Sequence, residues 1–282
     1  MRNFETTEKQ LSQVPAVQLL VTLGYEFISP SAAFRERQKR CSNVLLEGVL
    51  YEQLKKLNRI RYKGEEFLFS EENLQSAIQK LKNIKYDGLL KTNEAVYDLL
   101  TLGTALEQTI EGDSKSFTLN YIDWRHPGRN KFHVTVEYSV ERSRSSETIR
   151  PDIVLFVNGI PFGVIECKSP QVEIDQAVSQ SIRNQNDDHI PRLFVYSQLV
   201  MALNKNSARY ATTGTAAKFW SQWREPGLNI DAASPKEPEW HTLERLVQES
   251  LLNRIELRSA DNSQELSGNP LPQRLVTEQD IA

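Results

Sequence analysis

The sequence predicts a mixed α/β fold (α+β) in which helices flank a central sheet. Apolar residues recur at helical spacing through most of the first hundred residues. From residue 117 the period of the pattern changes from about 3.6 residues to two, the period of a β-strand. An apolar run at 153–157 then leads through Asn158-Gly159 into a second apolar run. Together these observations indicate helices followed by a sheet.

The N-terminal half is expected to be mainly helical. Gly24 closes the first apolar pattern, because glycine readily adopts the left-handed conformation at a helix end. Asn43 and Ser70 are typical N-cap residues. The glutamates that follow Ser70 also suit the dipole of a helix start. These signals give helices at 8–24, from Asn43, from Ser70 and at 93–109, a short strand at 24–28 and a loop at 35–40.

The second half contains the strands. The run at 153–157 is apolar throughout, which indicates burial on both faces and a central position in the sheet. After the break at Ser169-Pro170, apolar residues four apart indicate a helix. The expected elements are strands at 117–121, 132–138, 153–157, 199–203 and 208–213, and a helix at 173–185.

Asn158-Gly159 between two apolar runs predicts a β-hairpin, because both residues tolerate positive φ. Asp152 stands where the first strand begins, and Glu166 and Lys168 stand where the second strand ends. The turn therefore brings these three residues to the same end of the hairpin. Glu166 and Lys168 share a face by their spacing, and Cys167 points the other way, into the core.

The loop length decides whether the two acids meet. A two-residue loop would pair Val157 with Ile160 and send Asp152 and Glu166 to opposite faces of the sheet. A three-residue loop would pair Val157 with Pro161 and place Asp152 opposite Glu166. We expect the three-residue loop or an equivalent bulge, since a glycine at the turn supplies the left-handed residue that such a loop needs.

The composition is that of a soluble globular protein. The chain has 282 residues, 39% hydrophobic and 25% charged, with a formal net charge of −3. No apolar run approaches a membrane span, and the polar start has no signal-peptide pattern. Two distant cysteines, Cys41 and Cys167, fit a reducing compartment. We expect a cytoplasmic protein without membrane association.

Two parts of the chain differ in composition. From Pro226, prolines with aspartate, serine and lysine mark a linker. We therefore expect one domain over 1–225, and a linker with a C-terminal helix and tail over 226–282.

Basic residues gather in two places, between 35 and 40 and between 55 and 63. Each cluster can be a solvated surface or a site of phosphate contact. The same two interpretations are open for Arg150, at the edge of the hairpin. Arg183 lies off the apolar face of the helix at 173–185. Arg150 and Arg183 are our candidates for DNA binding.

Two carboxylates and an amine at adjoining strand ends suit metal-dependent hydrolysis of phosphodiesters. Asp152 and Glu166 offer oxygen ligands of the kind that Mg²⁺ prefers, and the backbone carbonyl of Cys167 is a third candidate. Lys168 would orient or deprotonate the attacking water and stabilise negative charge. The simpler interpretations are a turn-capping role for Asp152 and a salt bridge between Lys168 and Glu166.

Other chemistries have little support. The four histidines show no metal-ligand spacing, and no G-x-S-x-G motif indicates a serine hydrolase. No phosphate-binding loop is encoded, so we do not expect this chain to bind ATP. Trp220 and Trp223 are expected to fill the core or cover the linker rather than to stack on bases.

The hairpin resembles a known nuclease pattern. Pro151-Asp152, a hairpin, and then Glu166-x-Lys168 is similar to the signature of the PD-(D/E)XK nuclease superfamily. The whole run 150–170 resembles the N-terminal nuclease region of the R subunit of type I restriction-modification enzymes, and so do 182–185, 190–194, 208–215 and 218–220.

The resemblance implies a restriction-endonuclease-like sheet and residue roles. Asp152 and Glu166 carry over as metal ligands and Lys168 as the catalytic lysine. A glutamine on the following helix matches Gln180, another catalytic candidate. The tyrosine expected four residues later is Asn184 here. Some relatives place an acid on the first helix, where spacing gives Ser12; Glu8 is the nearest acid.

The same resemblance implies a function and partners. These are Mg²⁺-dependent cleavage of double-stranded DNA and assembly with methyltransferase (M) and specificity (S) subunits. ATP would serve only a helicase motor that this chain does not encode. The alternative is a DNA-binding or scaffold module of the same fold that does not cleave in isolation.

Overall fold

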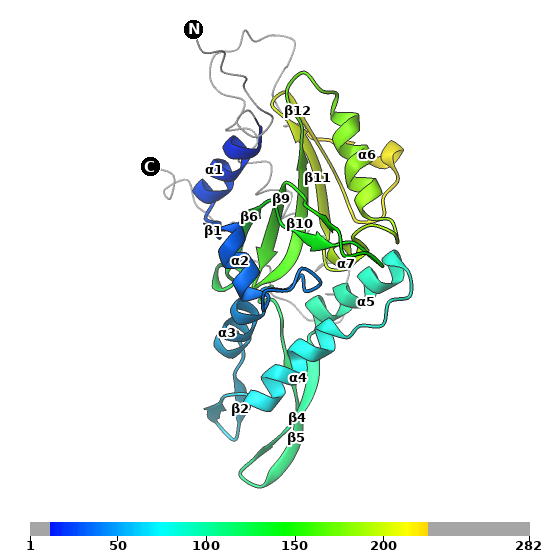
Figure 1. Cartoon of the computed structure of the whole chain (residues 1–282). Coiled ribbons are helices and arrows are strands. Elements are labelled where there is room, and N and C mark those ends of the chain that lie inside the picture. The colour runs from blue at the N-terminus through cyan, green and yellow to red at the C-terminus, as the bar shows by residue number, and fades with distance from the viewer. Residues whose placement is uncertain (1–11, 225–282) are drawn as a thin grey trace.

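The structure is a computed structural model, and it describes residues 12–224. At its centre is a seven-stranded sheet in the order β1-β6-β9-β10-β11-β12-β13 (Figure 1). β1 pairs with β6 and β10 with β11 in parallel, and the remaining neighbours are antiparallel. The predicted mixed sheet is confirmed. Its strands are β1 (Glu26–Phe27), β6 (Phe132–Val136), β9 (Ile153–Val157), β10 (Ile160–Cys167), β11 (Leu199–Asn204), β12 (Ser207–Ala211) and β13 (Ser221–Gln222).

Helices flank this sheet. In Figure 1, α1 and α2 lie on one side of the strands and α6 on the other. α6 connects β10 to the parallel strand β11 and packs against both. The helices are α1 (Val14–Thr22), α2 (Pro30–Glu36), α3 (Glu47–Leu57), α4 (Glu71–Lys82), α5 (Leu89–Leu102), α6 (Ile174–Asn184) and α7 (Pro191–Phe194), with 3-10 turns η2 (Pro127–Arg129) and η3 (Ala217–Phe219).

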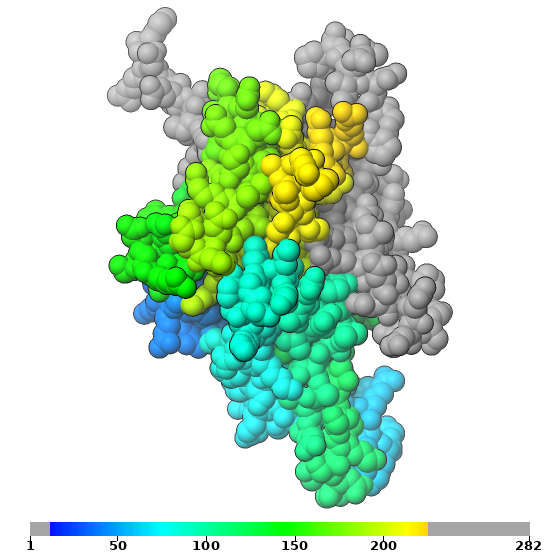
Figure 2. Space-filling model, turned by 90° about the vertical axis from the view of Figure 1, so that its right-hand side faces the viewer, coloured from blue at the N-terminus to red at the C-terminus, as the bar shows by residue number. Residues whose placement is uncertain are grey.

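Three two-stranded hairpins complete the described fold. β4 and β5 form the longest, which extends with α4 beyond the sheet (Figures 1 and 2). A short hairpin of β7 and β8 lies in the chain between β6 and β9, and it leads directly to Asp152. The strands are β2 (Ile60–Tyr62), β3 (Glu65–Phe67), β4 (Thr104–Ile110), β5 (Asp113–Leu119), β7 (Val140–Glu141) and β8 (Thr148–Ile149).

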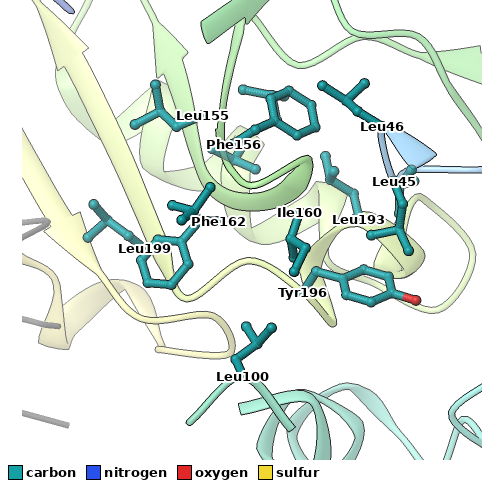
Figure 3. Packing of buried hydrophobic residues seen from close by; sticks show 14 of the residues in the cluster. Leu45, Leu46, Leu100, Leu155, Phe156, Ile160, Phe162, Leu193, Tyr196 and Leu199 are labelled. Carbon is teal, nitrogen blue, oxygen red and sulfur yellow. The ribbon is translucent and has the colours of Figure 1, made fainter. Parts of the chain in front are cut away.

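The core surrounds β9 and β10, whose residues are all buried, as the continuous apolar pattern predicted. Figure 3 shows Phe156 and Ile160 from these strands among the residues of one hydrophobic cluster, with Leu46 and Leu193. Because both faces of these two strands are covered, their positions leave little freedom. The residues at their ends are therefore held by a rigid frame.

The hairpin has a two-residue turn followed by a bulge. Val157 pairs with Ile160, so the expected pairing of Val157 with Pro161 is wrong. Asn158 and Gly159 both have positive φ, 52° and 82°, which is the geometry of a tight two-residue turn. The register then shifts between Pro161 and Gly163, and Ile165 pairs with Ile153. This bulge restores the register that places Asp152 opposite Glu166, as our alternative expectation required.

The helix expected at 93–109 is partly wrong. α5 ends at Leu102, and Gly103 follows with a φ of 74°. A side chain at Gly103 would meet the carbonyl oxygen of Leu119 at 2.4 Å. The residues after Gly103 form β4. Its buried apolar residues Leu106 and Ile110 are four apart, a spacing that fits both a helix and a strand.

Two further boundaries differ from expectation. Asn43 does not cap a helix, because its Oδ1 accepts the N–H of Leu45 in a local turn and α3 begins at Glu47. The segment 35–40 is not wholly a loop, since α2 extends to Glu36. The cap at Ser70 is confirmed: its hydroxyl accepts the N–H of Asn73. The strand at 24–28 is confirmed as β1, and the helix at 173–185 as α6.

Part of the first expected helix, together with Glu8, lies outside the described residues. The linker and C-terminal helix expected over 226–282 lie outside them as well. Within residues 12–224, no helix combines the length and the apolar character needed to cross a membrane.

Candidate active site

The hairpin brings the predicted residues together at one end of the sheet. Asp152 precedes β9, Glu166 and Cys167 end β10, and Lys168 follows. The backbone N–H of Cys167 donates to Oδ2 of Asp152 at 2.7 Å, across the two strands. Asp152 therefore faces the end of β10, as the bulged register requires.

Glu166 is completely buried and is held by two amides from α6. Nε2 of Gln180 donates to Oε2 at 2.8 Å, and Nδ2 of Asn184 donates to Oε1 at 2.9 Å. Residues four apart lie on the same face of a helix, so both amides reach one carboxylate. The sequence placed Gln180 near the site only by resemblance and left the role of Asn184 open. Both contact Glu166.

The carboxyl groups of Asp152 and Glu166 interact directly. Burial raises the pKa of Glu166 well above its usual value, and the charge and hydrogen bond of Asp152 raise it further. Lys168 and the hydrogen bond from Asn184 act in the opposite direction on this pKa. A neighbouring like charge disfavours the ionised form of a carboxyl group, so both causes act on Glu166 in the same direction.

Consecutive residues at the start of α1 reach both strand ends. Oγ of Ser12 donates to the carbonyl oxygen of Lys168 at 2.7 Å. Nε2 of Gln13 donates to the carbonyl oxygen of Asp152, also at 2.7 Å. The sequence suggested Ser12 only as a place for an acid, and it gave no signal for Gln13. Contacts across more than a hundred residues leave no local pattern.

A polar pocket of about 450 Å³ opens between Lys168 and α6, and neither Asp152 nor Glu166 lines it. Lys168 and Gln180 line it together with Arg183, whose side chain is exposed. Two cationic side chains, Lys168 and Arg183, and one acid, Asp175, which pairs with Arg209, line this opening, so it suits an anionic ligand. The remaining lining residues, both from α6, are Gln176 and Ser179.

Arg150 lies two residues before Asp152 in the chain. Its side chain is exposed and it does not line the pocket. Among residues 12–224, neither Arg150 nor Arg183 takes part in an ion pair. Both are therefore available to a negatively charged partner.

The basic clusters do not form part of this site. Arg37 is buried and its guanidinium lies 4.2 Å from the ring centroid of Tyr138, so it is neither a solvated nor a phosphate-facing residue. In the second cluster, exposed ion pairs join Arg61 to Glu66 and Lys63 to Glu111, as on a solvated surface. None of these four residues is among the groups that shift the pKa of Glu166.

Trp220 and Trp223 pack against the protein, as expected, rather than exposing their ring faces for stacking on bases. The indole N–H of Trp220 donates to the carbonyl of Thr215 at 3.1 Å, and the ring of Trp223 lies 5.5 Å from that of Tyr210. In the part of the chain that the structure describes, no group of three or more His, Cys, Asp or Glu side chains could hold a metal ion. Any cation here would depend on two carboxylates with backbone oxygen and water.

The central mixed sheet with flanking helices is a restriction-endonuclease-like fold, and its acid pair lies at the end of the central hairpin. The chain belongs to the family described as "Type I restriction enzyme R protein N terminus", whose model matches residues 5–219.

Relatives of this chain are endonuclease subunits by name. It is 28% identical over 224 residues to the type I restriction enzyme HindI endonuclease subunit of Haemophilus influenzae, which covers 77% of this chain and 20% of that protein. It is 27% identical over 183 residues to the SsaAORF53P endonuclease subunit of Staphylococcus saprophyticus, covering 60% of this chain and 19% of that protein. The chain thus spans about a fifth of the length of these relatives.

Proposed function

We propose that this chain is a Mg²⁺-dependent endonuclease region that hydrolyses phosphodiester bonds in double-stranded DNA. The observation that carries this proposal is the hydrogen bond from the N–H of Cys167 to Asp152, which holds the Asp152 carboxyl at the end of β10 beside Glu166 and Lys168. The charge of Asp152 is also one of the causes that raise the pKa of Glu166. Membership of a type I restriction enzyme family supports a nuclease role in a restriction system.

The donor set is suited to Mg²⁺. This ion binds through one or two carboxylates and keeps several waters, so Asp152, Glu166 and the backbone carbonyl of Cys167 would suffice as protein ligands. The raised pKa of Glu166 supports this assignment, because a cation beside two crowded carboxyls would take the place of the proton on Glu166. When bound, Mg²⁺ would lower the pKa of a water and neutralise charge on the phosphate.

Lys168 would act on the water and the phosphate. Its ammonium lies close enough to oppose the rise in the Glu166 pKa, and it also lines the open pocket. From this position it would orient or deprotonate the attacking water and stabilise negative charge on the phosphate oxygens. Arg150 and Arg183 would contact the DNA backbone.

Gln180 would act through Glu166. Its amide donates to one carboxylate oxygen and leaves that oxygen a further lone pair for a cation. It also lines the pocket, where the scissile phosphate would lie. We therefore assign Gln180 a positioning role in the reaction.

The whole protein would be a cytoplasmic complex. We propose methyltransferase and specificity subunits as its partners, and an ATP-driven motor outside this chain as the source of movement along DNA. The family description and the names of the relatives support a type I restriction assembly. In such an assembly the recognition sequence would be read by another subunit.

The experiment is plasmid cleavage by the full assembly carrying Asp152→Ala. Asp98→Ala, an exposed acid on α5, is the matched control. We expect cleavage with Mg²⁺ by wild type and the control, and none by Asp152→Ala or in a chelator. Wild-type cleavage by Asp152→Ala would contradict the site assignment.

A second candidate function is a module of the same fold that binds DNA or partners without cleaving it. The complete burial of Glu166 favours it, because a cation must reach that carboxylate. If this candidate is right, any cleavage by the assembly comes from another part of it. Assemblies with the wild-type chain and with Asp152→Ala would then cleave equally well.

A further inference from the structure

The start of α1 carries two buried donors that the proposed reaction does not use directly. Ser12 and Gln13 are each 3% exposed, and they donate to the carbonyl oxygens of Lys168 and Asp152. We propose that Ser12 and Gln13 are positioning residues, which hold the two strand ends so that Asp152, Glu166 and Lys168 keep their mutual geometry. This inference rests on the proposed nuclease function.

Lys168 needs such a contact because it lies beyond the last pair of its strand. β10 pairs with β11 as far as Cys167 and Leu203. The N–H of Lys168 still donates to the carbonyl of Leu203 at 2.9 Å. The carbonyl oxygen of Lys168 accepts a hydrogen bond from the hydroxyl of Ser12. The backbone that carries the amine is therefore fixed from two directions.

Asp152 is held in the same way. Its carbonyl accepts the N–H of Glu137 at 3.0 Å and the side-chain amide of Gln13 at 2.7 Å. Oε1 of Glu137 lies 3.4 Å from the same amide, so Gln13 also joins the end of β6 to the start of β9. One carbonyl with two donors on different elements has little freedom to move.

The two contacts act as one device because their donors are adjacent in the chain. They span 156 and 139 residues of sequence, yet both come from the single turn that leads into α1. Successive residues of a helix point about 100° apart, which lets one turn reach two separate strand ends. In Figure 1, α1 lies on one side of the sheet. The two contacts are made at the ends of the central strands β9 and β10.

The geometry of a catalytic site is sensitive to small movements. A misplacement of about 1 Å can reduce a rate by about 100-fold. Loss of a partner outside the ligand set typically weakens metal binding by about 10- to 100-fold. Ser12 and Gln13 contact no carboxylate of the acid pair, so their effect would pass through the backbone of Asp152 and Lys168.

The test is binding of Mn²⁺ to the full chain, measured by calorimetry without DNA. The variants are Ser12→Ala and Gln13→Leu, which remove one donor each. The controls are Ser181→Ala and Gln53→Leu, because both side chains are buried and each has a buried polar atom without a hydrogen-bond partner. Thermal unfolding of each variant is recorded alongside.

We expect the two test variants to bind Mn²⁺ at least about tenfold more weakly than their controls. Ser12→Thr keeps the hydroxyl donor and should retain wild-type affinity, and it decides the question if Gln13→Leu does not fold. The positioning role is overturned if Ser12→Ala binds as Ser181→Ala does, or if Ser12→Thr binds as weakly as Ser12→Ala.

Failure of the nuclease proposal would look different. In that case wild-type chain would bind no Mn²⁺, and the wild-type assembly would not cleave. If wild type binds and cleaves while the test variants match their controls, the nuclease proposal stands and the positioning role falls.

Discussion

Nδ2 of Asn184 donates to Oε1 of Glu166 at 2.9 Å, and both side chains are buried. Asn184 occupies the position where the family resemblance led us to expect a tyrosine. With Gln180 on the other oxygen, it gives the carboxylate of Glu166 two neutral donors from a single helix. These donors partly replace the water that the buried group has lost.

Removal of Asn184 should therefore weaken the acid pair as a cation site. We expect Asn184→Leu to lower Mn²⁺ affinity by about 10- to 100-fold, because the ionised carboxylate would lose a donor. Calorimetry on the full chain measures it. Asn186→Leu, an exposed position just beyond α6, is the control and should bind as wild type. Equal affinities for the two variants would show that Asn184 does not support Glu166.

The raised pKa of Glu166 gives a prediction for stability against pH. An acid whose pKa is higher in the folded chain binds its proton more tightly there, so its contribution is complete below the unfolded pKa. That contribution is lost as pH rises through the folded pKa. With a chelator present, stability should fall with rising pH more steeply in wild type than in Glu166→Gln.

The comparison of these two chains isolates Glu166 from other titrating groups. The pKa values of Glu26 and Asp113 are lowered, which acts on stability with the opposite sign, and they titrate alike in both chains. The measurement is the midpoint of urea unfolding at a series of pH values. If the unfolding midpoints of wild type and Glu166→Gln changed with pH in parallel, the raised pKa of Glu166 would be wrong.

The turn of the central hairpin should tolerate no side chain at Gly159. Its φ of 82° favours glycine, and a Cβ would lie 2.5 Å from the carbonyl oxygen of Leu46. Gly112 has a similar φ of 84° with no atom within 4 Å of such a Cβ. Each alanine variant should lose about 1–2 kcal/mol from backbone strain.

Gly159→Ala should lose more than Gly112→Ala, because the clash with the backbone of Leu46 adds to the strain. Urea denaturation with two-state fitting gives the free energy of unfolding of each. If the two variants were equally stable, the close approach of Leu46 to this turn would be wrong.

Arg183 should contribute one phosphate contact to DNA binding. In a chain made inactive by Asp152→Asn, Arg183→Gln should weaken binding of a short duplex at low salt and reduce the slope of log K against log salt by about one. Fluorescence anisotropy over a salt series measures both. Lys85→Gln, an exposed residue outside the site, should leave the slope unchanged. An unchanged slope for Arg183→Gln would show that Arg183 makes no phosphate contact with DNA.

Local chemistry explains why the hairpin was predictable. Asn158-Gly159 sets its own turn, and the apolar runs beside it predict two buried strands. The bulge before Gly163 was foreseen only as an alternative, because both loop lengths fit the same residues. In the structure the carbonyl of Phe162, the residue at the bulge, accepts the N–H of Gln198 at 2.8 Å. A contact with a residue more than thirty positions away cannot be predicted from the residues of the turn.

Some residues of the candidate site could be predicted from the sequence and others could not. Asp152, Glu166 and Lys168 were found because a hairpin brings neighbours in sequence together. Ser12 and Gln13 were not, because their partners are more than a hundred residues away and hydrogen-bond donors of this kind are common on any surface. The strand at 104–110 was missed because its two buried apolar residues, Leu106 and Ile110, are four apart and fit either period.

The central claim is that Asp152, Glu166 and Lys168 carry out DNA cleavage. The most direct measurement is plasmid cleavage and ATP hydrolysis by the full assembly with Lys168→Ala, beside Lys85→Ala as the control. We predict that Lys168→Ala keeps DNA-dependent ATP hydrolysis and loses double-strand cleavage, while the control keeps both. Cleavage by Lys168→Ala at the wild-type rate would contradict the account.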